Sequence, residues 1–153
     1  MDPFVRHFIR SSLAWFSVGM ALGLYLAIAP MQAALIRPAH VHANLLGFVS
    51  MMIFGVAYHV LPRFTGVPLF DRRLPTLHLW LSNVGLAALV LGWTARAAST
   101  VAGEILVGGG AALSAAGGAL FVYNLWRTLD AAGAAARGPR PVARQRRAPL
   151  PTL

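Results

Sequence analysis

Long runs of apolar residues, separated by short polar segments, dominate the chain. Each run has about 20 residues or more, the length at which a helix crosses the hydrocarbon core of a bilayer. The runs lie at residues 8–30, 39–62, 76–98 and 101–129. They predict an all-α protein, an integral membrane bundle of four transmembrane helices over residues 1–130.

Prolines and glycines suggest where the helices begin, end and touch. Pro38 is expected to open the second helix, because proline is favoured at the first helical position. Pro62 and Gly66 are expected to end it. Small residues at helical spacing predict close helix contacts. They are Gly19 and Gly23 in the first helix, and Gly110, Ser114 and Gly118 in the fourth.

Composition supports the membrane prediction. The chain is 58% hydrophobic and only 11% charged, whereas a soluble domain has about 25% charged residues. It has no cysteine, which excludes disulfides and thiolate ligands. The first run is too long for a signal peptide and lacks a clear cleavage site, so we expect it to be a spanning helix. No Ser-His-Asp arrangement indicates a hydrolase, and we predict no catalytic residue.

The net charge of +9 follows membrane topology. All 13 basic residues are arginine, and in a four-helix arrangement only Arg37 and Arg96 fall on the side opposite the other eleven. This bias predicts cytoplasmic N- and C-termini. We therefore expect contact with membrane lipid and no nucleic-acid partner. The basic tail, residues 131–153, is expected to be disordered and to lie against anionic lipid; a partner-binding tail is the alternative.

Two histidines, His40 and His42, lie one residue apart at the outer end of the second helix. Ionisable residues in membrane helices are candidates for function, and imidazole ligates haem iron and other metals. Residues i and i+2 point about 200° apart, so the spacing suits a helix between two planar cofactors. His40 shares its face with Asn44, Gly47 and Met51, a candidate cofactor surface, and the His42 face is apolar. The alternatives are histidines that hydrogen-bond carbonyls and headgroups, and a bare metal site.

The other three histidines, His7, His59 and His78, lie near the inner helix ends. The 17 residues from His42 to His59 span about 25 Å of helix, so one compact site cannot use both groups. For His78 a structural role is favoured. The alternatives are an inner haem or metal site and a quinone or proton contact.

Residues 39–93 resemble the late helices of the catalytic subunit of haem–copper oxidases, most closely the cbb-type cytochrome c oxidase. The resemblance rests on five ordered features: His40/His42, Leu46–Gly47, Phe54–Gly55–Tyr58, Pro62–Arg63–Gly66 and His78–Trp80. It implies that His40 ligates a high-spin haem and His42 a low-spin haem. The family places both haems toward the outer side, which agrees with the arginine bias.

The resemblance also implies what is missing. The family's other low-spin ligand lies on an early helix, and its copper-binding histidines and cross-linked tyrosine lie on middle helices. This chain has no counterpart of those helices. We therefore expect haem b but no copper, and no oxidase activity from the chain alone.

Three functions are compatible with these features. The first is a small haem b protein of the bacterial cytoplasmic membrane, a homodimer with one or two haems per chain or with haem shared across the dimer. Its role would be electron transfer or the binding of oxygen or nitric oxide. The second is a quinol-linked carrier with an outer and an inner haem. The third is a non-catalytic accessory or assembly subunit of a respiratory oxidase or nitric oxide reductase. The partners implied are a respiratory electron donor or an oxidase complex.

Overall fold

The computed structural model describes residues 1–96 and 98–138, and in them it contains helices and turns but no strand. In order the elements are α1 (Pro3–Ile28), the 3-10 turn η1 (Pro30–Gln32), α2 (Ala33–His42), the π-helical segment η2 (Ala43–Ser50), α3 (Met51–Thr65), α4 (Leu74–Ala95) and α5 (Thr100–Ala136). The segments α2, η2 and α3 form one continuous helix of 33 residues, which we call the second span. Over these residues the chain is thus all-α, with four helices long and apolar enough to cross a membrane, as predicted.

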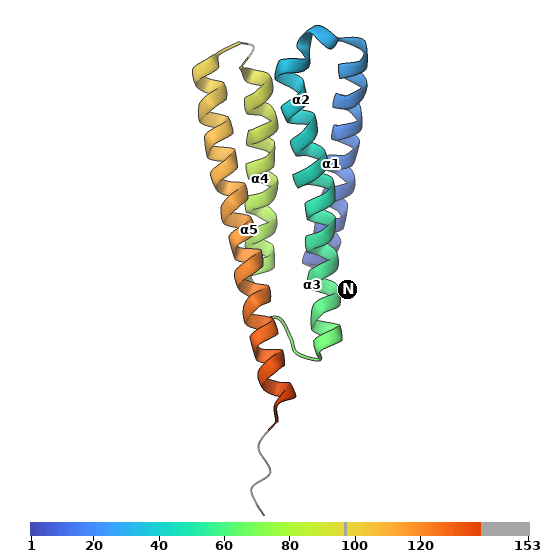
Figure 1. Ribbon diagram of the computed structural model, residues 1–153, viewed down its shortest axis with the longest axis vertical. Helices are drawn as coiled ribbons and strands as arrows, with labels where there is room; N and C mark the ends of the chain where they lie inside the picture. Colours follow the sequence, from blue (N-terminus) through green and yellow to red (C-terminus); the bar gives the residue numbers. More distant parts are fainter. Residues whose placement is uncertain (97, 139–153) are drawn as a thin grey trace, which may run out of the picture.

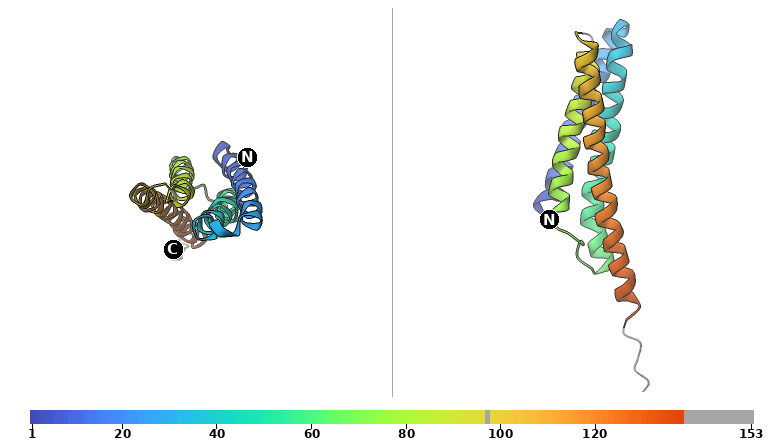
Figure 2. Two further views of the ribbon diagram at one scale, coloured as in Figure 1. Left: turned by 90° about the horizontal axis from the view of Figure 1, so that it is seen from above. Right: turned by 90° about the vertical axis from the view of Figure 1, so that its left-hand side faces the viewer.

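The four spans form two antiparallel hairpins that pack side by side (Figure 1). One hairpin is α1 with the second span, and the other is α4 with α5, as the view from above in Figure 2 also shows. The start of α1, the loop at residues 66–73 and the end of α5 lie at one end of the bundle, which we call the terminal end. His40 and His42 lie toward the opposite end, so the histidines divide between the two ends as expected.

The helix bounds differ from the sequence prediction where proline was taken as a boundary. The second span begins at Ala33, so Pro38 lies inside α2, and Pro62 lies inside α3. Membrane helices tolerate internal proline because neighbouring groups satisfy the freed backbone carbonyls. The span ends at Thr65, and the capping residue Gly66 has a φ of 68°, the left-handed conformation that glycine adopts readily.

The end of α5 also differs. The helix continues to Ala136 rather than stopping at 129, so residues 131–136 of the expected disordered tail are helical. Residues 139–153, the rest of that tail, lie outside the described residues.

Glycines pack α4 against α5, but at a different spacing from the one predicted. Three glycines of α5 recur every seven residues and are buried against α4: Gly103, Gly110 and Gly117. Gly103 lies against Gly92 of α4, and Gly110 lies against Gly85. A seven-residue repeat keeps one seam facing the partner helix. The predicted stripe was partly wrong: Gly118 has no neighbour within 4 Å of an added Cβ.

A buried aromatic cluster joins the two hairpins in the terminal half of the bundle. The His78 ring, fully buried, lies 4.9 Å from Phe8, 4.6 Å from Phe54 and 5.7 Å from Phe121 between centroids. Tyr58 packs against Phe8, Phe121 and the His78 ring itself. Aromatic contacts at such distances stabilise packing beyond the area they bury, so this cluster fixes how the hairpins meet.

The loop between α3 and α4 is held onto α5 by side-chain hydrogen bonds. The amide of Asn124 accepts from the backbone N–H of Asp71 and donates to its carbonyl oxygen, both at 2.9 Å. Thr128 accepts from the N–H of Phe70 at 3.0 Å. These bonds replace the helical partners that loop backbone lacks.

Candidate functional site

The H-x-H pair lies where the second span changes its winding. α2 ends at His42, and the next eight residues are π-helical. Ser50 shows the wider winding, because its hydroxyl donates to the carbonyl of Leu45, five residues earlier, at 2.8 Å. π-helical turns are rare and frequently occur at functional sites. This segment was not predicted, and we see no residue pattern in it that would have revealed it.

His40 is held by α1. Its Nδ1 lies 2.8 Å from the carbonyl oxygen of Gly19. A carbonyl oxygen only accepts, so in the neutral imidazole this contact places the proton on Nδ1 and leaves the lone pair on Nε2. The Asn44 amide nitrogen also lies near this atom, 3.3 Å from Nδ1. The ring fits because α1 has no side chain at Gly23, where an added Cβ would lie 2.9 Å from Cε1 of His40. The neutral ring is thus oriented with Nε2 able to bind a metal.

His42 is held in the same tautomer by its own helix. Its Nδ1 lies 2.7 Å from the carbonyl oxygen of Pro38, so Nε2 again keeps the lone pair. The two rings therefore have separate acceptors on separate helices. Both histidines thus hydrogen-bond backbone carbonyls, as one of the alternatives proposed. They do so through Nδ1, so each Nε2 is left available to ligate a metal.

The two faces of the second span have different surroundings. On the His42 side Leu45, Val49 and Ile53 are 56%, 41% and 55% exposed. On the His40 side Asn44 packs against Gly19, where an added Cβ would lie 2.5 Å from its amide nitrogen. The His40 side faces protein, and the His42 side faces the surroundings of the bundle.

The remaining predicted cofactor residues lie deeper on the His40 side. The Asn44 amide donates to the His40 carbonyl oxygen at 2.9 Å. Gly47 faces Trp15, where an added Cβ would lie 2.5 Å from the Trp15 Cβ. Met51 is 1% exposed and belongs to the core. Asn44 therefore adjoins His40, while the space beside Gly47 is filled by α1 and Met51 packs inside the bundle.

The three histidines nearer the terminal end lie in different environments. His78 is buried in the aromatic cluster with Nδ1 3.2 Å from the Tyr58 hydroxyl. At His59 the Arg63 guanidinium lies 3.0 Å from Nδ1. A guanidinium only donates, so Nδ1 accepts and the proton of the neutral ring is on Nε2. His7 is exposed and lines a cavity beside α4. Within residues 1–96 and 98–138, no three His, Cys, Asp or Glu side chains are grouped to hold a metal ion.

Sequence reasoning missed one polar contact near this site. The indole N–H of Trp15 donates to the side-chain oxygen of Asn83 at 3.0 Å, which links α1 to α4. Two polar groups at helix-facing positions were visible in the sequence, but their 68-residue separation gave no sign that they pair.

Comparison with known proteins gives one family. Residues 4–131 match the model of the family described as cytochrome C and quinol oxidase polypeptide I. The Cbb3-type cytochrome c oxidase subunit CcoN1 of Stutzerimonas stutzeri is 28% identical over 160 aligned positions, covering 86% of this chain and 34% of that protein. Cytochrome c oxidase subunit 1 of Rhodobacter capsulatus is 30% identical over 115 positions, covering 59% of this chain and 22% of that protein. The chain thus spans about a third or less of these relatives, and no solved structure matches it.

Proposed function

Because this chain belongs to the cytochrome c and quinol oxidase polypeptide I family, we propose that it is a membrane haem protein in which His40 and His42 ligate haem iron through Nε2. The observation that carries the proposal is the contact that each ring makes through Nδ1. Each Nδ1 lies within 2.8 Å of a backbone carbonyl oxygen. Metal-ligating histidines usually donate their other ring N–H to such an acceptor.

The ring orientation of both His40 and His42 fits iron ligation, but only the His42 side is open to a large ligand, because α1 fills the space beside Gly47 on the His40 side. The other histidines fit haem less well. His59 presents an N–H at Nε2 instead of a lone pair, because Arg63 donates to its Nδ1. Bound haem b supplies a one-electron carrier, or a gas-binding position where one axial site is open. The protein's part is to orient both imidazoles.

The position of His42 favours a shared site. Leu45, Val49 and Ile53 on its side are exposed, so a haem on His42 would lie against the outside of one bundle. A second copy would cover its other side, which supports a homodimer with haem between the chains. We place both termini in the cytoplasm of a bacterium and the histidines at the outer side of its cytoplasmic membrane, with a respiratory electron donor as partner. The arginine bias supports this orientation.

A second candidate is an accessory or assembly subunit of a respiratory oxidase or nitric oxide reductase. What favours it is length: the matched region corresponds to 34% of one relative and 22% of the other. In such a role the oxidase-like helices would dock onto a larger complex. The quinol-linked carrier with two haems has less support, because the inner histidines do not converge.

The experiment is a pyridine haemochrome assay with absorbance spectra on the protein purified after haem-sufficient expression. We expect a Soret band that is weakened or lost in both His40→Ala and His42→Ala. His59→Ala is the matched control and is expected to retain the full haem content. Carbon monoxide added to the reduced protein distinguishes an open iron position, which shifts the spectrum, from a six-coordinate one, which does not.

A protein without a Soret band contradicts the haem proposal. If that protein also co-purifies with an oxidase or reductase complex, the accessory role replaces it. Loss of one haem in His59→Ala would indicate the two-haem carrier.

A further inference from the structure

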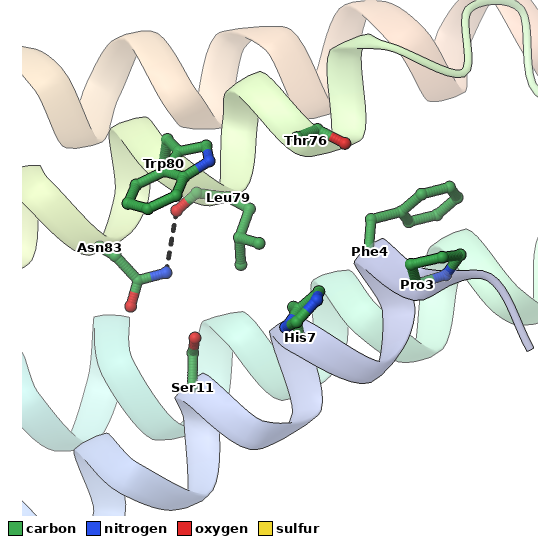
Figure 3. A pocket seen from close by; sticks show the side chains of 8 residues that line it. All are labelled: Pro3, Phe4, His7, Ser11, Thr76, Leu79, Trp80 and Asn83. Atoms are coloured by element: carbon green, nitrogen blue, oxygen red, sulfur yellow. Dashed lines mark hydrogen bonds between the residues drawn. The ribbon is translucent and has the colours of Figure 1, made fainter.

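An open cavity with a volume of about 640 Å³ lies between α1 and α4 near the terminal end, and we call it the α1–α4 groove (Figure 3). The second span contacts both helices and closes the groove on its inner side. The inner surface is apolar, with Phe4 buried and Leu79 partly buried. At the mouth the Trp80 side chain is 65% exposed. The H-x-H pair lies toward the other end of the bundle, so the groove is separate from that site.

Four polar side chains line the groove on two facing walls. His7 and Ser11, four residues apart, share a face of α1. Thr76 and Asn83, seven residues apart, share a face of α4. Figure 3 shows the two pairs on opposite sides of the groove. Each wall therefore carries two polar groups in a surface that is otherwise apolar.

Two of these groups lie at the depth of the hydrocarbon core. The 22 residues of α4 are about 33 Å long, which matches a hydrocarbon core of about 30 Å. Asn83 lies about 14 Å from the start of α4, near the middle of that length. Trp15 of α1 donates to Asn83, so Ser11 lies only about 6 Å nearer to the terminal end. Both groups are deeper than the headgroups of a bilayer.

Packing within the chain leaves hydrogen-bonding capacity on both walls. Within residues 1–96 and 98–138, no hydrogen bond uses the side chain of His7, Ser11 or Thr76. Asn83 donates one amide N–H to the Leu79 carbonyl at 2.9 Å, the dashed line of Figure 3, and its second N–H remains for another acceptor. Lipid tails offer no partner to such groups, whereas Ser, Thr, Asn and His side chains in membranes hydrogen-bond across helices. The groove therefore suits protein better than lipid.

The lining also indicates the chemistry of the protein that would cover it. None of the residues that line the groove is arginine, aspartate or glutamate, so a charged side chain would have no counter-ion there, at a high cost in a membrane. The neutral amide of glutamine or asparagine both donates and accepts, and it therefore suits Ser11 and Asn83. A helix satisfies its own backbone in lipid, so a helix can carry such an amide to this depth.

The position of the groove favours a partner other than a second copy of this chain. The homodimer proposed above uses the His42 side of the second span. The helices that form the groove pack on the other side, where α1 holds His40 and Leu86 of α4 lies against Gly47. A dimer formed through the His42 side therefore leaves the groove open.

We propose that the α1–α4 groove binds a transmembrane helix of a partner subunit. A neutral amide side chain of that helix hydrogen-bonds Ser11 and Asn83, and its apolar side chains pack against Trp80. This docking rests on the second candidate function, because an oxidase or reductase complex must supply the helix. It adds to that candidate the surface that docks and the chemistry of the contact.

The test measures helix binding in lipid vesicles by Förster energy transfer. The full chain has no cysteine, so a donor dye is attached at Ala98→Cys, an exposed position in the turn between α4 and α5. The acceptor-labelled probe is a synthetic peptide of about 20 leucine and alanine residues with one central glutamine. We expect saturable binding of one peptide per chain. The same peptide with leucine in place of glutamine should bind about 3- to 30-fold more weakly, the effect of an interhelical hydrogen bond in a membrane.

Two variants test the walls of the groove. Ser11→Ala should reduce the advantage of the glutamine peptide, because it removes a group that the amide contacts. Trp80→Ala should weaken both peptides, because it removes apolar surface at the mouth. The matched controls are Ser17→Ala, an exposed serine of α1 that does not line the groove, and Trp126→Ala, whose side chain is 67% exposed against 65% for Trp80. Both controls should bind the peptides as the unmodified chain does.

Equal affinity for the two peptides, or binding unchanged in both Ser11→Ala and Trp80→Ala, would overturn the proposal. Loss of peptide binding when phosphatidylglycerol replaces phosphatidylcholine would assign the groove to an anionic lipid instead. Energy transfer between two labelled copies of the chain that is lost in Trp80→Ala would assign it to a second copy.

The assay needs no haem, so its failure leaves the proposal based on the Soret band intact. Failure of the docking can also be distinguished from failure of the accessory role. Co-purification with an oxidase complex that persists in both Ser11→Ala and Trp80→Ala would show that the accessory role holds but uses another surface.

Discussion

Two adjacent glycines in α5 allow a direct test of how the hairpins are built. Gly110 faces α4, where an added Cβ would lie 2.6 Å from the Gly85 carbonyl oxygen and 2.7 Å from the Leu89 nitrogen. Gly109 faces away, with nothing within 4 Å of an added Cβ. Gly110→Ala and Gly109→Ala therefore insert the same methyl group into opposite environments.

The steric term is estimated from these distances. Ordinary contact begins at 3.4 Å, so the Cβ of Gly110→Ala overlaps the Gly85 oxygen by about 0.8 Å. Both contacts are backbone atoms, which cannot rotate away, so α5 must move from α4. Overpacking of this kind costs about 1–3 kcal/mol. Replacing glycine by alanine in a helix stabilises by about 0.4–1 kcal/mol in both variants, so their difference isolates the steric cost.

The assay is unfolding in mixed micelles of dodecyl maltoside and sodium dodecyl sulfate, followed by far-ultraviolet circular dichroism. We expect Gly109→Ala to be at least as stable as the unmodified protein. The free energy of unfolding of Gly110→Ala should fall below that of Gly109→Ala by about 1–3 kcal/mol. Equal unfolding of the two variants would refute the seven-residue glycine seam.

Three further substitutions test other contacts. Gly23→Ala places a Cβ 2.9 Å from the His40 ring, so we expect it to displace that imidazole and alter the Soret band. The helix content measured by circular dichroism should not change, and an unaltered Soret band would contradict the assigned packing. Asn124→Ala removes both 2.9 Å bonds to the α3–α4 loop, and faster hydrogen exchange confined to that loop is expected, whereas unchanged exchange would show that the loop is held elsewhere. Asp2→Asn breaks an ion pair with Arg72 whose side chains are 31% and 71% exposed; we expect less than about 1 kcal/mol of lost stability, and a larger loss in the unfolding assay would argue against this reasoning.

The spans could be predicted because one physical requirement sets them. A helix that crosses a membrane needs about 20 apolar residues, and the sequence shows four such runs. The predicted helix boundaries were wrong where proline was taken to begin or end a helix, a rule that holds for helices in water. Pro38 and Pro62 end helices in water far more readily than in a membrane, where breaking the helix would expose its backbone to lipid.

The glycine seam was only partly predicted, for a different reason. A four-residue spacing was read from Gly110, Ser114 and Gly118, whereas helices that wind around each other repeat every seven residues. The buried set, Gly103, Gly110 and Gly117, has that spacing, and Gly85 and Gly92 on α4 repeat it. The seven-residue spacing was present in the sequence, but it becomes evident only when the glycines of α4 and α5 are compared.

The sequence predicted which histidines form the candidate site, but not the groups that orient their rings. His40 and His42 were identified by their place in an apolar helix, and their division between two faces followed from helical geometry. Their acceptors are backbone carbonyls at Gly19 and Pro38. Every residue has a carbonyl, so no sequence pattern distinguishes these two.

The two acceptors also make the histidines respond differently to change elsewhere. The Gly19 carbonyl that orients His40 is on α1, so this orientation depends on the packing of two helices. The Pro38 carbonyl that orients His42 is four residues away in the same helix, so that orientation persists wherever the helix forms. A substitution that moves α1 away from the second span should therefore disturb His40 and leave His42 in place. Gly19→Leu is such a change, because even a single Cβ at this position would lie 2.5 Å from the Asn44 side chain. If each imidazole holds its own haem, the spectrum of Gly19→Leu should match that of His40→Ala. It should lack the contribution of the His40 haem and retain that of the His42 haem. Equal loss of both contributions would show that the two sites are mechanically coupled.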